Sequence, residues 1–170
     1  PKLSPEKIGI KPGPMAAAVE LIDIRLKGPG GHTSRPAESV DLIWAQSHLV
    51  ISLEESIKHH LDQREPVVLA FGRVKGGHAF NVLPDEVVLK GTLRYLHSEL
   101  REKLHQIMDD SINSVEQLTD ARIKWAVTHT SPGLTNDSEC TDLIIAAGKA
   151  VLGDENVYMM EEASMGGEDF

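Results

Sequence analysis

The chain of 170 residues is long enough for one compact domain together with part of another. Its 26 acidic and 17 basic residues give a formal net charge of −9, which argues against nucleic acid and anionic membranes as partners, because both select a basic face. With 41% apolar but only 4% aromatic residues, we expect a folded core built mainly of aliphatic side chains.

The single cysteine, Cys140, cannot form an internal disulfide, and this favours a reducing, cytoplasmic setting. No apolar run approaches the roughly 18 residues needed to cross a bilayer, and no charged-then-apolar signal segment stands at the start. The sequence opens on Pro1 and stops at Phe170 within a glycine-rich, acidic motif. We therefore expect a piece of a longer protein.

The first elements follow from proline content and apolar periodicity. Residues 1–17 are rich in proline and predict an extended segment. From 18 to 27 apolar and polar residues alternate, as in a half-buried strand. After a glycine-rich turn at 28–31, a helix is expected over 39–61 with apolar residues in two stripes. One stripe can cover a sheet, and a second copy of the domain is the simplest cover for the other.

The next elements complete a recognisable order. Strands are expected over 67–74 and 87–96, then a helix over 98–118 with Ser98 as its N-cap, then a strand over 123–127. The order strand, helix, strand, strand, helix, strand predicts an α+β fold. It is the ferredoxin-like split βαβ arrangement, in which a four-stranded antiparallel sheet carries both helices on one face.

After Thr130 the pattern changes. Asn136 and Glu139 resemble a capping box before a helix that runs to Gly153, and a short strand over 157–160 follows. This amphipathic tail has no evident place on a ferredoxin-like sheet. The expected division is a linker (1–17), a main domain (18–130) and a helix-strand start of a neighbouring domain (131–170).

Three places could carry chemistry. His32 follows the glycine-rich turn at 28–31, where glycines let another molecule approach closely. Asn81 lies in a loop at 76–84, and loops held by a rigid sheet often carry function. Arg94 lies on a strand and could offer a fork of donors to a carboxylate. Taken singly, each has a plainer and commoner explanation: a connecting turn, a hairpin loop and a surface ion pair.

Other candidates carry weaker signals. The remaining histidines show no metal-binding spacing such as HExxH. Cys140 begins a helix, which favours a thiolate, but the sequence sets no histidine beside it, so a structural or incidental role is favoured. The acidic pairs Glu161-Glu162 and Glu168-Asp169 could bind a divalent ion, although such pairs are usually solvated.

Four motifs occur together, namely GPGGHTSRP, GGHAFNVLPDEVVLKGTLR, SPGLTND and MGGEDF in this order. Each motif alone is weak, but their order and spacing make a specific signal. The chain resembles the aminoacylase, hippurate hydrolase and auxin-conjugate amidohydrolase family of two-metal peptidases. The resemblance extends from about residue 12 to residue 170, nearly the whole chain.

The resemblance implies roles for individual positions. His32 looks like the histidine that reaches across a dimer into the partner's active site, where it polarises the scissile carbonyl and holds the oxyanion. Asn81 looks like the polar residue that binds the substrate near that carbonyl, and Arg94 like the group that clamps a substrate carboxylate. Gly166 and Gly167 resemble the substrate-binding loop that lines the active site from the catalytic-domain side.

Two points stay open within the resemblance. The roles of Glu168 and Asp169, which follow the two glycines, are not assigned. Many relatives have a second histidine where this chain has Ala37, so fine details of substrate placement are not implied.

The resemblance also implies a homodimer formed through an inserted lid domain, and two divalent metal ions (zinc, manganese or cobalt) held by residues outside this chain. The implied reaction is metal-dependent hydrolysis of the amide bond of an N-acyl amino acid or a similar small conjugate. The chain alone would be inactive. A stand-alone dimeric module that binds a small regulatory ligand is an alternative of a different class, although it would have no use for the tail after Thr130.

Overall fold

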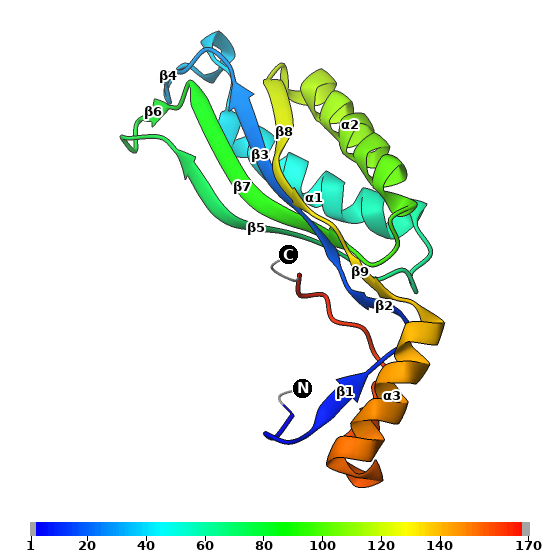
Figure 1. The fold of residues 1–170 in the computed structure, drawn as a ribbon. Helices are drawn as coiled ribbons and strands as arrows, with labels where there is room; N and C mark the ends of the chain where they lie inside the picture. Colours follow the sequence, from blue (N-terminus) through cyan, green and yellow to red (C-terminus); the bar gives the residue numbers. More distant parts are fainter. Residues whose placement is uncertain (1–2, 168–170) are drawn as a thin grey trace.

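The computed structural model describes residues 3–167 (Figure 1). Its α-helices are α1 (Leu42–His60), α2 (Leu100–Thr119) and α3 (Ser138–Leu152), with short 3-10 helices at Pro36–Glu38 and Asp154–Asn156. Its strands are β1 (Ile8–Ile10), β2 (Gly13–Ala16), β3 (Ala18–Lys27), β4 (Gly31–His32), β5 (Val67–Gly76), β6 (Val82–Leu83), β7 (Glu86–Tyr95), β8 (Arg122–Ser131), β9 (Leu134–Asn136) and β10 (Val157–Met159).

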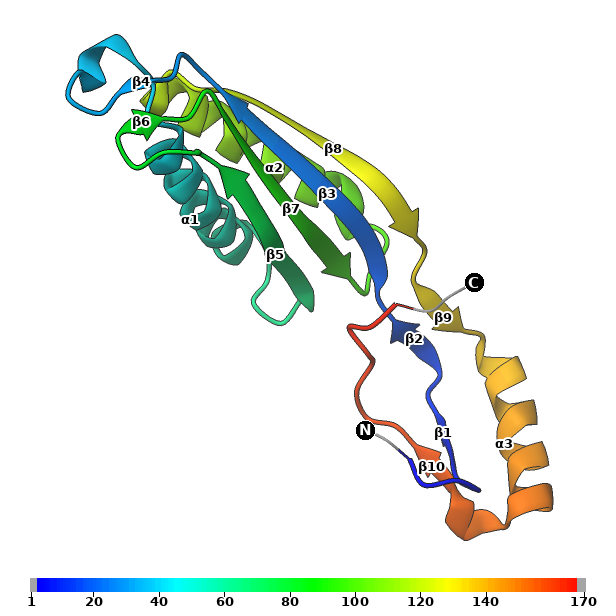
Figure 2. The same cartoon turned by 90° about the vertical axis from the view of Figure 1, so that its left-hand side faces the viewer.

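The largest sheet has four strands in the order β5-β7-β3-β8, and each neighbouring pair is antiparallel. Both α1 and α2 lie against one face of this sheet and leave the other face open (Figure 2). This arrangement confirms the ferredoxin-like split βαβ fold predicted from the order of elements. The open face and the two ends of the sheet are therefore the surfaces free to carry function.

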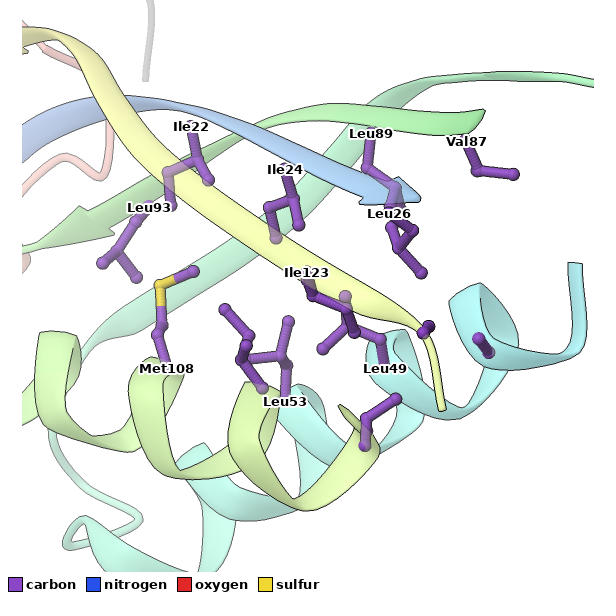
Figure 3. Packing of buried hydrophobic residues seen from close by; sticks show 14 of the residues in the cluster. Ile22, Ile24, Leu26, Leu49, Leu53, Val87, Leu89, Leu93, Met108 and Ile123 are labelled. Atoms are coloured by element: carbon purple, nitrogen blue, oxygen red, sulfur yellow. The ribbon is translucent and has the colours of Figure 1, made fainter. Parts of the chain in front are cut away.

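The core lies between the sheet and the two helices (Figure 3). Alternate residues of β3 point into it, and Ile24 and Leu26 are completely buried there. Leu49 and Leu53 of α1 and Met108 of α2 meet them from the other side. Each such side chain contributes about 1.5–3 kcal/mol of burial free energy, so this layer provides most of the stability of the domain.

Helix α1 is apolar on two sides, as predicted. Leu42, Leu49 and Leu53 are fully buried against the sheet. Most of the second stripe, including Val50 and Ile57, is partly buried against the same core. The second copy expected as the simplest cover for this stripe is therefore not needed for most of it, because these side chains pack on the core of the same chain. The apolar side chains of α1 that remain exposed are Ile43, Trp44 and Ile51.

The helix caps differ from the sequence prediction at two places. Ser98 does not cap α2, because Glu99 occupies the N-cap position and makes no side-chain capping hydrogen bond. Asp137, one residue after the predicted Asn136, caps α3 by accepting a hydrogen bond from the Cys140 amide. Both misplacements are of one residue, the usual error when a boundary is read from a pattern.

The segment that precedes the four-stranded sheet in the chain pairs with the segment that follows it (Figure 1). Strand β2 runs antiparallel to β9, and β1 runs parallel to β10. These pairs connect residues before 17 to residues after 133, so the chain enters and leaves the four-stranded sheet side by side. Helix α3 follows β9 and exposes a row of large apolar side chains, Leu143, Ile144 and Val151. None of the described helices is long and apolar enough to cross a membrane.

Candidate functional site

His32 lies at the end of the sheet farthest from α3, where the short strands β4 and β6 pair (Figure 2). In this pair His32 stands opposite Val82, and Gly31 opposite Leu83. A Cβ atom on Gly30 would lie 2.6 Å from the Leu83 carbonyl oxygen, so only glycine allows this approach. The glycine-rich turn thus holds an exposed histidine against the loop of the second motif.

The hydrogen bonds of His32 fix its tautomer. The Ser34 backbone N–H donates to Nδ1 of His32 over 3.2 Å, and the Ser34 hydroxyl lies 2.8 Å from the same nitrogen. Because a backbone amide can only donate, Nδ1 must be an acceptor, and the proton of the neutral ring lies on Nε2. The exposed ring therefore presents an N–H donor to solvent or to another molecule, as an oxyanion-binding group must.

Asn81 lies in the same cluster. The backbone carbonyl oxygen of Asn81 accepts a hydrogen bond from the Thr33 backbone N–H at 3.1 Å, and the Asn81 side chain is exposed. The structure thus brings His32 and Asn81 together from sequence positions far apart. The neighbouring Phe80, which the sequence reasoning did not single out, is completely exposed. A large aromatic residue within a loop that opens on Gly76-Gly77 is the signal that could have identified it.

Arg94 lies at the opposite end of the sheet, near the end of β7. Its side chain is half-buried, and Nη1 donates to the Met165 carbonyl oxygen at 2.9 Å. The tail is held there by further contacts, since the Ala17 amide donates to the carbonyl oxygens of Ser164 and Gly166. The structure thus brings Arg94 together with Gly166.

Gly167 completes this second cluster. A Cβ on Gly167 would lie 2.8 Å from Cγ2 of Val19, the residue that pairs with Arg94 across β3 and β7. A side chain at this position would therefore displace Val19 or the tail. Glu168 and Asp169, whose roles the sequence left open, lie outside the described residues.

The two clusters are far apart within one chain (Figure 1). β4 and β6 lie beyond the Glu86 end of β7, whereas Arg94 is next to its last residue. A strand rises about 3.3 Å per residue, so Glu86 and Arg94 are separated by about 26 Å along the strand. A small substrate that touches Arg94 of one chain cannot touch His32 of the same chain.

A buried polar network that the sequence did not reveal supports the Arg94 end. The Glu20 side chain is fully buried and accepts hydrogen bonds from Arg101 Nε at 2.7 Å, His105 Nε2 at 2.6 Å and Tyr95 Oη at 3.2 Å. The ring of His105 in turn packs edge-on against Trp125, with centroids 5.0 Å apart. Because Tyr95 follows Arg94 directly, this network anchors the strand end that carries the arginine.

The ionisation of this network follows from its contacts. Burial alone would raise the pKa of the Glu20 carboxyl, but hydrogen bonds and charges from His105 and Arg101 outweigh it and hold that pKa below its ordinary value. Burial, together with the adjacent Glu20 carboxylate, raises the pKa of Tyr95 to about 12. At neutral pH the network therefore contains an ionised glutamate and a neutral tyrosine.

The described residues 3–167 contain no cluster of three or more His, Cys, Asp or Glu side chains suited to a metal ion. The side chains present therefore do not fit a resident metal centre, and no catalytic step can be assigned to one within this part of the chain. Cys140 is exposed, with no disulfide partner.

The structure is a ferredoxin-like sheet that is entered and left by paired strands and that bears a polar cluster at each end. The comparison with protein families agrees. The model of the peptidase dimerisation domain of the M20 peptidases matches residues 18–119. The chain therefore belongs to this family, and the resemblance inferred from the four motifs is confirmed.

Known relatives support the same assignment. The chain is 32% identical over 176 residues to an N-acetyl-L-cysteine deacetylase of Bacillus subtilis, covering 100% of this chain and 40% of that protein. It is 29% identical over 167 residues to the hippurate hydrolase of Campylobacter jejuni, covering 98% of this chain and 44% of that protein.

A solved structure shares the fold. The YXEP protein of Bacillus subtilis, described as a dinuclear metal binding peptidase of the M20 family, superposes with a TM-score of 0.73 at 23% identity, covering 95% of this chain and 39% of that one. The chain thus spans less than half the length of these relatives.

Proposed function

We propose that this chain is the dimerisation and substrate-clamping lid of a metal-dependent amidohydrolase that cleaves the amide bond of N-acyl amino acids or similar small conjugates. The lid corresponds to residues 18–130. Residues 1–17 and 131–170 belong to a catalytic domain, which the pairing of β2 with β9 and of β1 with β10 supports. The chain alone is inactive, since the two divalent metal ions, zinc, manganese or cobalt, need ligands from elsewhere. The single exposed thiol of Cys140 fits a reducing, cytoplasmic setting.

One observation carries this proposal: the separation of His32 from Arg94 along β7. If both residues act on one small substrate, they must come from different chains, because about 26 Å of strand lies between them. Arg94 of one subunit, with Gly166 and Gly167 beside it, holds the carboxylate of the substrate. The Nε2–H group of His32 from the partner donates a hydrogen bond to the scissile carbonyl oxygen, and Asn81 binds close to that oxygen.

The homodimer uses the free edge of β5 and the adjacent flank of α1. β5 pairs only with β7 among the described strands, so its outer edge offers unpaired backbone groups. On α1, the apolar side chains Trp44 and Ile51 are 44% and 54% exposed. Edge-to-edge pairing of two copies would give the free backbone groups of β5 hydrogen-bond partners. It would also cover the exposed apolar side chains of α1.

Sedimentation of the chain at micromolar concentration tests the dimer. The variant Ile51→Lys should shift the chain toward the monomer, because it sets a charge in an apolar interface. Leu118→Lys is the matched control, since Leu118 is 57% exposed on α2, away from the proposed interface. A wild-type monomer, or equal dimers for both variants, would contradict this interface.

The catalytic role of His32 is tested in the full-length enzyme with an N-acyl amino acid as substrate. His32→Ala should lower kcat about 100-fold or more, the usual cost of losing an oxyanion donor. Ser34→Ala is the control, because it keeps the backbone N–H that fixes the tautomer, and it should stay within about threefold of wild type. A kcat for His32→Ala within threefold of wild type would remove the proposed role.

A further inference from the structure

The open face of the sheet carries a basic hollow that the proposed function does not use. The hollow measures about 410 Å³ and lies where β5 and β7 approach the loop after Gly76. Its charged lining consists of the four cations Arg25, Arg73, Lys75 and Lys90 and the two acids Asp85 and Glu86. Such a concentration of cations is unexpected in a chain with a net charge of −9.

An irregularity in β5 creates this hollow. Val67, Leu69 and Phe71 pack on the core, so regular alternation would turn Arg73 and Lys75 toward the helices as well. The pairing of β5 with β7 shifts between Phe71 and Arg73, which sets Arg73 opposite Lys90 and Lys75 opposite Val88. The shift therefore turns both basic side chains to the open face. Bulges that re-aim side chains in this way are common beside functional sites.

The cations of the hollow are only partly neutralised. Lys90 lies 2.9 Å from Asp23, and Arg25 lies 3.2 Å from the same carboxylate. Within residues 3–167, neither Arg73 nor Lys75 forms an ion pair with an acidic side chain. Arg73 also stands directly opposite Lys90, and like charges in that position destabilise a sheet. A negatively charged ligand between them would remove this repulsion.

We propose that Arg73, Lys75 and Lys90 form a binding site for a small dianionic oxyanion of the phosphate class. Arginine provides a planar fork for two oxygens, and the two lysines contribute point charges. The site is distinct from the Arg94 cluster, because Lys90 and Arg94 are separated by about 13 Å along β7 at the usual rise. It does not depend on the dimer, so its test is independent of the proposed function.

Nuclear magnetic resonance titration of the 170-residue chain with inorganic phosphate tests the proposal, at an ionic strength held constant with chloride. Backbone amides at 73–78 and at Lys90 should shift and saturate. A parallel titration with glycerol phosphate distinguishes free phosphate from a phosphomonoester by which of the two binds more tightly.

The double variant Arg73→Ala with Lys75→Ala should weaken binding at least about tenfold, and Arg73→Lys should retain it within about threefold. The matched control removes the same charge from the helices, with Lys58→Ala and Lys103→Ala, and should bind as wild type. Thermal unfolding verifies that each variant is folded. The proposal fails if the shifts do not saturate, if chloride reproduces them, or if the control loses as much affinity. Arg73, Lys75 and Lys90 would then be solvated surface charges without a bound ligand.

Discussion

Replacement of the buried Glu20 by glutamine is expected to destabilise the domain more than any surface substitution. The carboxylate accepts hydrogen bonds from Arg101, His105 and Tyr95 and is completely shielded from solvent. Glutamine has nearly the same size, so packing is kept. Glutamine lacks the negative charge, and its side-chain NH2 group can face the Nε2–H group of His105. Two donors that face each other cannot form a hydrogen bond.

The magnitude follows from these contacts. Hydrogen bonds to a charged group contribute about 1.5–3 kcal/mol each, and glutamine retains one acceptor oxygen. The Arg101 side chain is 48% exposed, so solvent screening reduces its share to about 1 kcal/mol or less. A loss of about 3 kcal/mol in the free energy of unfolding is therefore expected. For a chain of this size, this lowers Tm by about 6–12 °C.

The effect should also depend on pH. The pKa of Glu20 is lowered in the folded chain below its ordinary value of 4.5. The stabilisation is therefore fully present above that value and is lost as the pH falls through the lower folded pKa. The difference in stability between wild type and Glu20→Gln should be constant near neutral pH and narrow below pH 4.5.

Thermal unfolding followed by circular dichroism and by the fluorescence of Trp125, which packs on His105, measures both effects. Glu54→Gln is the control, because Glu54 forms an exposed pair with Lys58 and should change stability by less than about 0.5 kcal/mol. If Glu20→Gln were as mild as this control, or if the difference grew on acidification, the reasoning about the network would be refuted.

Three further substitutions follow from individual contacts. Gly30→Ala should leave the core intact but displace the His32 loop and lower kcat of the full-length enzyme, because its Cβ would lie 2.6 Å from the Leu83 carbonyl oxygen; unchanged kinetics would contradict this. Asp137→Ala removes the cap of α3 and should cost about 1 kcal/mol in denaturant unfolding, whereas no change would exclude a capping role. Leu49→Ala opens a cavity in the core and should cost about 2–5 kcal/mol by the same measurement; a smaller loss would show that α1 relaxes into the space.

Local periodicity was sufficient to predict the fold. The alternation of Ile22, Ile24 and Leu26 predicted β3, and all three side chains are buried. The helical spacing of apolar residues around Leu104 and Met108 predicted α2 in the same way. These patterns are local because they depend only on which face of one element meets the core.

Features that depend on contacts between distant residues could not be predicted in this way. In the Glu20 network, Arg101 is 81 residues and His105 is 85 residues away from Glu20 in the sequence. No sequence pattern indicates contacts between residues so far apart. The bulge near Gly72 reverses the facing of the residues after it, which a regular alternation cannot show. The packing of most of the second stripe of α1 on the core of its own chain likewise depends on contacts between elements.

The candidate site was predicted residue by residue but not as an arrangement. The motifs identified His32, Asn81 and Arg94, but spacing in sequence did not reveal that the first two cluster while the third lies at the far end of β7. That separation depends on the direction of β7 within the sheet. Their roles in substrate binding and catalysis remain predictions.

A heterodimer of two defective full-length subunits tests the central claim most directly. One subunit carries His32→Ala and the other Arg94→Ala, each with its own affinity tag, so that the mixed dimer can be purified. If the two residues serve one substrate from different chains, the mixed dimer contains one intact site and one doubly defective site. The proposal predicts about half the wild-type kcat per dimer, against a loss of about 100-fold or more in the His32→Ala homodimer. A mixed dimer as inactive as that homodimer would contradict a site shared between subunits.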